Sequence, residues 1–251
     1  PVRPRYIIPD YGKFMREGSA FLQLPPPKDI FEALNSLLIF YKHVPSVTNF
    51  PVYLGALDEL LEPFMDDVDE ATAKKLIRLF LIHVDRTVLD SFSHANIGPK
   101  ATRAGRLILE AEAELEQAVP NLTLKYQEGV TPDDFALEAV NTALHSAKPS
   151  FANHAMFKSE LGENYVSASC YNGLLLGGGS YTLCRLMLGT IARKSKNLAD
   201  FKERMLPYVM DVMAKYMDAR IKFEVEESGF FENHFLAKEG FIHRDRFTAM
   251  F

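Results

Sequence analysis

Cys170 lies in the segment of this chain that best combines a reactive side chain with residues typical of turns. The segment reads SASCYNGLLLGGGSYTLCRL. Small and polar residues precede the cysteine, and an apolar run and three glycines follow it. Residues 165–169 alternate as a strand does, and Asn172 and Gly173 are typical of the turn that ends one. A cysteine at such a turn can meet a substrate, which makes Cys170 a candidate catalytic residue. The alternative is a cysteine that packs as a small apolar side chain.

The three glycines at 177–179, followed by Ser180, precede a helical pattern that we expect to cover 180–194. A glycine-rich turn that opens a helix can present backbone N–H groups to a phosphate. Neither GxxxxGK[ST] nor GxGxxG occurs here, so we favour a structural role in close turns beside the cysteine loop. Cys184 falls within the expected helix and is interpreted as a core residue.

Polar residues in expected loops supply the remaining candidates for a substrate pocket. Loops on a rigid scaffold commonly carry substrate contacts. The substrate-binding candidates are His94, Asn153, His154 and Asn172, with Asn233 and His234 ranked below them. The sequence contains no HExxH or CxxC motif and no facial-triad spacing, so we expect no protein-bound metal.

The elements that must position these residues are mostly helices in the first half of the chain. Apolar periodicity and capping residues predict helices over 29–43, 70–92 (Leu76, Leu79, Phe80 and Val84 inward), 101–118, 131–147 (Thr131 as N-cap), 180–194 and 198–222. Strands are expected at 122–126 and 165–170. The order of strands and helices after residue 120 favours an α/β fold, with a helical region over 1–119 leading into an α/β unit over 120–251.

Composition sets limits on the class of protein. The chain has 251 residues, 47% of them hydrophobic and 24% charged, with a net charge of −5, which is typical of a globular protein and unfavourable for nucleic acid binding. Two cysteines make no disulfide framework, and no export signal or run of about eighteen apolar residues occurs. We therefore expect a cytoplasmic protein with no membrane partner.

Several long segments resemble the YjjI-like family of glycyl radical enzymes, which are similar to pyruvate formate-lyases. They are PRYIIPDYGKFMREGSAF, HVPSVTNFPVYLGALDELL, HANIGPKAT, VPNLTLKYQEGVTPDDF, KPSFAN, SCYNGLLLGGGSYTLCRL and FFENHFLAKEGFI. The resemblance implies half of an α/β barrel whose loop carries the reactive cysteine. Cys170 matches the cysteine that becomes a thiyl radical and removes a hydrogen atom from a small organic substrate.

The glycine that stores the radical in this superfamily has no match here. Its context is roughly Arg-Val-x-Gly followed by an aromatic residue, which none of the fourteen glycines shows. We therefore expect this chain to be the front portion of a longer anaerobic enzyme, inactive by itself and binding no cofactor. The resemblance further implies an S-adenosylmethionine and iron–sulfur activating enzyme as partner, and a homodimer.

The residues next to Cys170 limit which of the family's reactions the enzyme could catalyse. Pyruvate formate-lyases have two adjacent cysteines, whereas Ser169 and Tyr171 flank Cys170. Diol dehydratases and choline lyases have a glutamate two positions after the cysteine, where Asn172 cannot take a proton. Two other readings stay open: a half-length protein that binds a ligand or complements a radical-bearing chain, and an ordinary cysteine nucleophile, which needs a nearby base.

Overall fold

The computed structural model describes residues 4–44, 53–87, 93–117, 119–168 and 172–250, and it is a mixed α/β structure. Its strands are β1 (Tyr6–Ile8), β2 (Tyr53–Ala56), β3 (His94–Ile97), β4 (Asn121–Tyr126), β5 (Ser150–Asn153), β6 (Tyr165–Ala168), β7 (Asn172–Leu175), β8 (Gly178–Leu183) and β9 (Phe247–Met250). Its α-helices are α1 (Tyr11–Glu17), α2 (Ile30–His43), α3 (Leu57–Leu61), α4 (Glu70–Thr87), α5 (Arg103–Leu115), α6 (Asp133–Ser146), α7 (His154–Leu161), α8 (Leu188–Arg193), α9 (Leu198–Asp200), α10 (Leu206–Lys222), α11 (Phe230–Asn233) and α12 (Phe235–Lys238).

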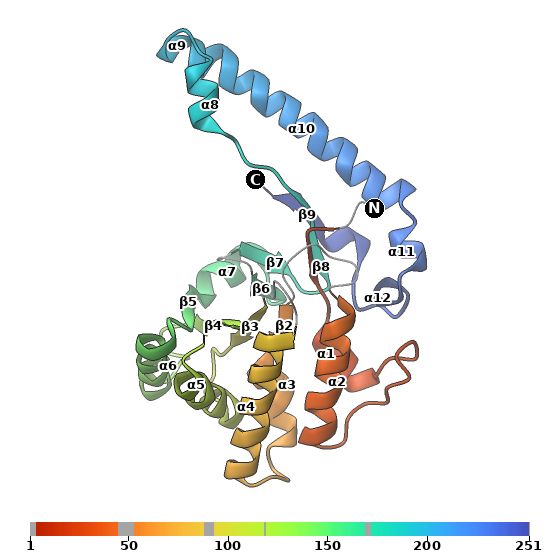
Figure 1. Cartoon of the computed structure of the whole chain (residues 1–251), viewed down its shortest axis with the longest axis vertical. Helices are drawn as coiled ribbons and strands as arrows, with labels where there is room; N and C mark the ends of the chain where they lie inside the picture. Colours follow the sequence, from red (N-terminus) through yellow and green to blue (C-terminus); the bar gives the residue numbers. More distant parts are fainter. Residues whose placement is uncertain (1–3, 45–52, 88–92, 118, 169–171, 251) are drawn as a thin grey trace.

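A four-stranded parallel sheet forms the centre of the larger part of the molecule (Figure 1). Its strand order is β2-β3-β4-β5, and each crossover contains helices. Leu54, Ala95, Ile97, Leu122 and Leu124 point from its strands into the main hydrophobic core, which they share with the helices. This parallel sheet confirms the α/β class. Within the described part of the chain the sheet does not close on itself.

Several helices begin where the sequence predicts. Asp29 caps α2 by accepting a hydrogen bond from the Glu32 N–H at 2.9 Å. Helix α5 is capped by Thr102, whose hydroxyl accepts from Gly105 N–H. These side chains satisfy backbone donors that a helix start leaves unpaired. Helices α2, α4 and α5 confirm the helices expected at 29–43, 70–92 and 101–118; residues 88–92 and 118 of those ranges lie outside the described residues.

Other details of the helical prediction are wrong. Leu79, expected to face inward on α4, is 50% exposed, because Ile77 and Leu81 occupy the core face instead. Thr131 is not an N-cap: its hydroxyl accepts from Gln127 N–H in the preceding turn, and the cap position of α6 is Pro132, without a side-chain bond.

Strands also begin earlier than predicted. β1, β2 and β3 all precede residue 120, among the helices α1 to α5 of the same region. These strands have only three or four residues each, which is too short for a clear alternation. They bring the expected helical region and the expected α/β region into one sheet.

The glycines at 177–179 do not open a helix. Gly178 and Gly179 lie in β8, which pairs antiparallel with β1 and parallel with β9. A Cβ on Gly179 would lie 2.2 Å from the Tyr6 carbonyl oxygen, and one on Gly178 would lie 2.2 Å from that of Arg246. Strand β1 and the turn before β9 therefore approach β8 at distances that only glycine permits. Without a helix start here, the phosphate-loop alternative loses its basis; Cys184 follows the strand, half-buried and outside any helix.

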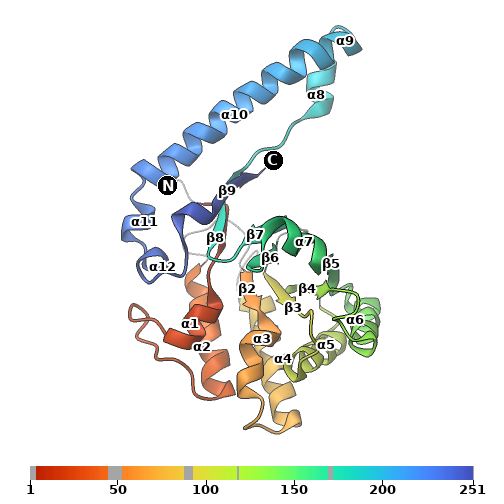
Figure 2. The same cartoon turned by 180° about the vertical axis from the view of Figure 1, so that it is seen from behind.

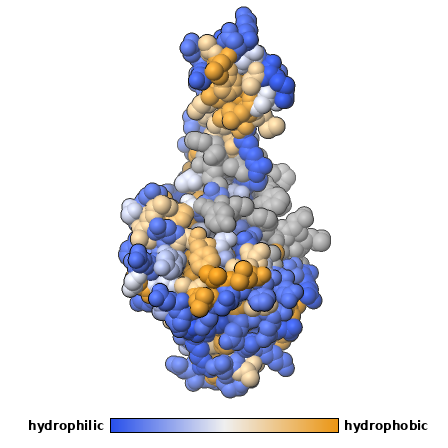
Figure 3. All heavy atoms as spheres, turned by 90° about the vertical axis from the view of Figure 1, so that its left-hand side faces the viewer, coloured by the Kyte–Doolittle hydropathy of each residue, from blue (hydrophilic) through white to orange (hydrophobic). Residues whose placement is uncertain are grey.

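Helices α8 to α10 project away from the sheet as an arm, as Figures 1 and 2 both show. Wide π-helical turns at 201–205 and 223–227 flank α10, and Pro207 lies in its first turn. The arm exposes the apolar side chains of Met187, Leu188, Leu198, Tyr208, Met210, Val212 and Tyr216. Figure 3 shows apolar surface on the arm, in the upper part of the view. In the described part of the chain, no helix combines the length and apolar character that crossing a membrane requires.

Candidate functional site

The central sheet has a second, polar face opposite the helices. Register pairs His94 with Asn121 and Asn96 with Thr123, and alternation places Lys125 on the same side. His94, Asn96, Thr123 and Lys125 are all buried, although each carries a polar or charged group. Buried polar side chains are costly unless they are satisfied, so a polar interior surface of this kind is a functional candidate.

The β6–β7 hairpin lies against this polar face. Ala168 pairs with Asn172 across the hairpin, and these are the last described residues on either side of residues 169–171, which include Cys170. Cys170 itself lies outside the described residues. Gly173 leaves room for α7, because a Cβ there would lie 2.4 Å from Leu161 Cδ1 and 2.8 Å from Phe157 Cε1. The hairpin is therefore held between the sheet and α7.

Asn96 fastens the hairpin to the sheet. Its Nδ2 donates to the Ser167 carbonyl oxygen at 2.7 Å, and its Oδ1 accepts from the Ser167 N–H at 3.0 Å. The Tyr53 hydroxyl donates to the same Oδ1 at 3.2 Å. Burial raises the pKa of Tyr53, with smaller effects from Glu59 and Asp58, so the phenol stays a donor. One side chain thereby satisfies both backbone groups of a residue two positions before Ser169.

Tyr165 fixes the base of the hairpin. Its carbonyl oxygen accepts from Lys125 Nζ at 3.2 Å, and that ammonium lies 4.6 Å from the Tyr165 ring. Its hydroxyl is 2.8 Å from Nδ1 of His154, and its ring stacks on Phe157 at 5.2 Å. Burial raises the pKa of Tyr165 to about 12. Burial, with Lys125 and Lys158, lowers the pKa of His154, which favours a neutral imidazole.

His94 is the most deeply buried of the predicted pocket residues. It is 4% exposed, and burial, with Lys148 adding to the effect, lowers its pKa to about 4. The imidazole is therefore neutral near pH 7, able to act as donor and acceptor at once. It lies on the polar face two residues before Asn96, on β3 and not in a loop.

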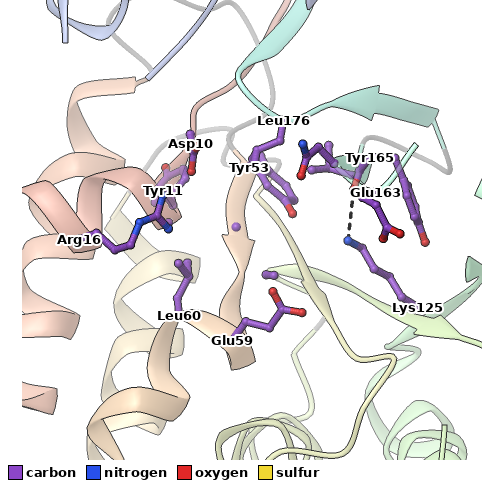
Figure 4. A pocket seen from close by; sticks show the side chains of 15 residues that line it. Asp10, Tyr11, Arg16, Tyr53, Glu59, Leu60, Lys125, Glu163, Tyr165 and Leu176 are labelled. Carbon is purple, nitrogen blue, oxygen red and sulfur yellow. Dashed lines mark hydrogen bonds between the residues drawn. The ribbon is translucent and has the colours of Figure 1, made fainter. Parts of the chain in front are cut away.

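A cavity of about 350 Å³ opens at the carboxyl end of the sheet, beneath the base of the hairpin (Figure 4). Its lining includes Arg16, Tyr53, Glu59, Lys125 and Tyr165. The carboxyl ends of parallel strands are the usual position of ligand sites in α/β proteins. The Lys125 side chain and the Glu59 carboxylate both point into the space between β2 and the hairpin.

The other predicted residues make structural contacts. Asn153 caps α7, its Oδ1 accepting from Met156 N–H at 3.0 Å. Asn233 Nδ2 donates to the Gly229 carbonyl oxygen at 2.8 Å, and His234 caps α12. Asn172 is half-buried at the start of β7. His94, His154 and Asn172 are thus on or beside the hairpin and polar face, whereas Asn233 and His234 lie in the later helices.

Sequence reasoning missed Asn96, Lys125 and Tyr165 as members of this site. A period of two was present in the strand at 121–126, where Asn121, Thr123 and Lys125 alternate with apolar residues. That pattern indicates a polar face on an otherwise buried strand. Among the described residues no cluster of three or more His, Cys, Asp or Glu side chains is arranged to hold a metal ion.

Comparison with known proteins identifies the family. The family model of glycyl radical enzymes described as YjjI-like matches residues 1–251. An uncharacterized protein of Haemophilus influenzae is 54% identical over 249 residues, which are 99% of this chain and 48% of the relative. The uncharacterized protein YjjI of Escherichia coli is 45% identical over 252 residues, 100% of this chain and 49% of the relative. The chain belongs to the YjjI-like glycyl radical enzyme family, and it spans about half the length of these curated relatives.

Proposed function

We propose that Cys170 is the hydrogen-abstracting residue of a radical enzyme that acts on a small organic substrate. The observation that carries the proposal is a family match over the whole chain together with a hairpin whose first strand, just before Cys170, is pinned to a buried polar face. A thiyl radical is reactive, and a chemically useful one needs a rigid support that excludes competing donors.

In this proposal Cys170 transfers the hydrogen atom, and other residues of the chain position it. A glycyl radical, in the part of a full-length relative that this chain does not span, would be installed by an S-adenosylmethionine and iron–sulfur activating enzyme and would supply the unpaired electron. The Cys170 S–H bond breaks when its hydrogen atom moves to that glycine, and it forms again when the sulfur takes a hydrogen atom from a substrate C–H bond. Asn96 and Lys125 act as positioning residues that fix the backbone before the cysteine.

The experiment uses a protein of the relatives' full length that contains this sequence. It is activated anaerobically in D₂O, without substrate, and followed by electron paramagnetic resonance. A glycyl radical gives a doublet because of its α-hydrogen. Hydrogen transfer to and from an S–D group would replace that hydrogen with deuterium and collapse the doublet to a singlet. Cys170→Ala should keep the doublet.

Cys184→Ala is the matched control, because it removes the other cysteine of this chain and should leave the collapse intact. A collapse at the wild-type rate in Cys170→Ala would show that another group relays the hydrogen, and the proposal would be wrong. Radical formation in both variants confirms that activation itself is unaffected.

Three finer features belong to the same proposal. The open parallel sheet would be half of an α/β barrel, and the missing strands would come from the remainder of a relative-length protein. The enzyme would be a cytoplasmic homodimer that works without oxygen. Ser169, Tyr171 and Asn172 would give it a reaction other than acyl transfer from pyruvate or the glutamate-assisted eliminations.

A further inference from the structure

The cavity beneath the hairpin contains a buried cation with unused hydrogen-bonding capacity. Lys125 is 9% exposed, and an ammonium group carries three donors. Within the described residues, Lys125 Nζ makes one hydrogen bond, to the Tyr165 carbonyl oxygen, and no ion pair. Burial lowers the pKa of Lys125, and the carboxylates of Glu59 and Asp58 oppose this effect only in part. An anion in direct contact with the ammonium would therefore offset more of the cost of burying its charge.

The rim of the cavity carries charges of both signs. Glu59 and Arg16 line it, both are exposed, and in the described structure neither side chain has a hydrogen-bond or ion-pair partner. Glu163, another lining residue, is engaged by Lys158 at 2.6 Å, and Asp10 caps α1. The groups left for a ligand are therefore a deep ammonium, a rim carboxylate and a rim guanidinium.

We propose that this cavity binds a small organic acid that carries a hydroxyl or amino group beside its carboxylate. The carboxylate pairs with Lys125, and the neighbouring O–H or N–H donates to Glu59. The volume of about 350 Å³ suits such a molecule. Since Lys125 also holds the first residue of β6, the ligand would lie against the base of the cysteine hairpin.

Binding is measured on the protein without any radical, so the outcome is independent of the proposed catalytic function. Propionate, lactate and alanine differ at one position next to the carboxylate, and they are titrated separately at low salt by calorimetry or ligand-observed NMR. Inorganic phosphate is the fourth probe. We expect lactate or alanine to bind at least tenfold more tightly than propionate.

Lys125→Met should weaken binding of the preferred acid at least tenfold, whereas Lys215→Met, which removes the same charge from α10, should change nothing. Glu59→Leu, which removes the hydrogen-bond acceptor, should retain carboxylate binding and lose the preference over propionate. Because Glu59 is exposed, this variant keeps the proposal testable even if Lys125→Met fails to fold. Equal binding of all three acids, saturation by phosphate alone, or wild-type affinity in Lys125→Met would overturn the assignment.

Discussion

The two faces of the central sheet are built from the same strands, β2, β3 and β4, but from opposite kinds of residue. One face sends Leu54, Ala95, Ile97, Leu122 and Leu124 into a core shared with the helices, while the other carries Tyr53, His94, Asn96, Thr123 and Lys125. Both faces are buried. The difference teaches that burial alone does not identify a core: the first face stabilises the fold without specific bonds, and the second gains its order from individual hydrogen bonds.

The largest effect should come from the apolar face. Leu124 is fully buried in the main core, and Leu124→Ala removes buried methyl groups and leaves a cavity. We expect a loss of about 2–5 kcal/mol in the free energy of unfolding, measured by urea denaturation. Thr123→Ala, its neighbour on the polar face, should cost about 1 kcal/mol. Equal losses for the two variants would contradict the division between the faces.

A smaller effect is expected on the polar face. Asn96→Ala leaves the buried N–H and C=O of Ser167 without their partner, which costs about 1–3 kcal/mol. Amide hydrogen exchange at Ser167 should accelerate selectively. Asn121→Ala removes an amide from the same face without touching the hairpin and serves as the control. Unchanged exchange at Ser167 in Asn96→Ala would mean that the hairpin is held by other contacts.

The third test concerns a carboxyl group within the apolar, helical layer. Glu112 on α5 is fully buried, and in the described structure neither of its oxygens has a hydrogen-bond partner. Burial, with Asp85 adding to it, raises its pKa from 4.5 to about 9. Between these values the folded state keeps a proton that the unfolded state releases, so stability falls as pH rises, by up to about 1.4 kcal/mol per pH unit.

Glu112→Gln replaces this carboxyl group with a neutral one of the same shape. The variant should exceed the wild type in stability at pH 8 and match it near pH 5, as measured by denaturation at both pH values. Glu128→Gln removes an exposed charge and should leave the pH dependence unchanged. If the wild type and Glu112→Gln lose stability in parallel between pH 5 and 8, Glu112 is not the group that titrates.

The sequence predicted the structural features that depend on residues close together in the chain. Helix α2 and its cap at Asp29 follow from periodicity within fourteen residues, and the strand before Cys170 follows from alternation. The four-residue strands β2 and β3 are too short to show a period. Asn96 contacts Ser167 across 71 positions, and no local pattern marks such a pair. The helix expected from 180 was wrong because close strand packing, invisible in the sequence, selects glycine there.

The glycines of β8 bear on how tolerance to mutation should be interpreted. At Gly178 and Gly179 the backbones of the turn before β9 and of β1 occupy the place of any side chain, so even alanine must push β8 away from one of these neighbours. Evolution would hold both positions as strictly as a catalytic residue. Their invariance would reflect the close approach of the neighbouring backbone. A search for catalytic residues that used invariance alone would select both glycines by mistake.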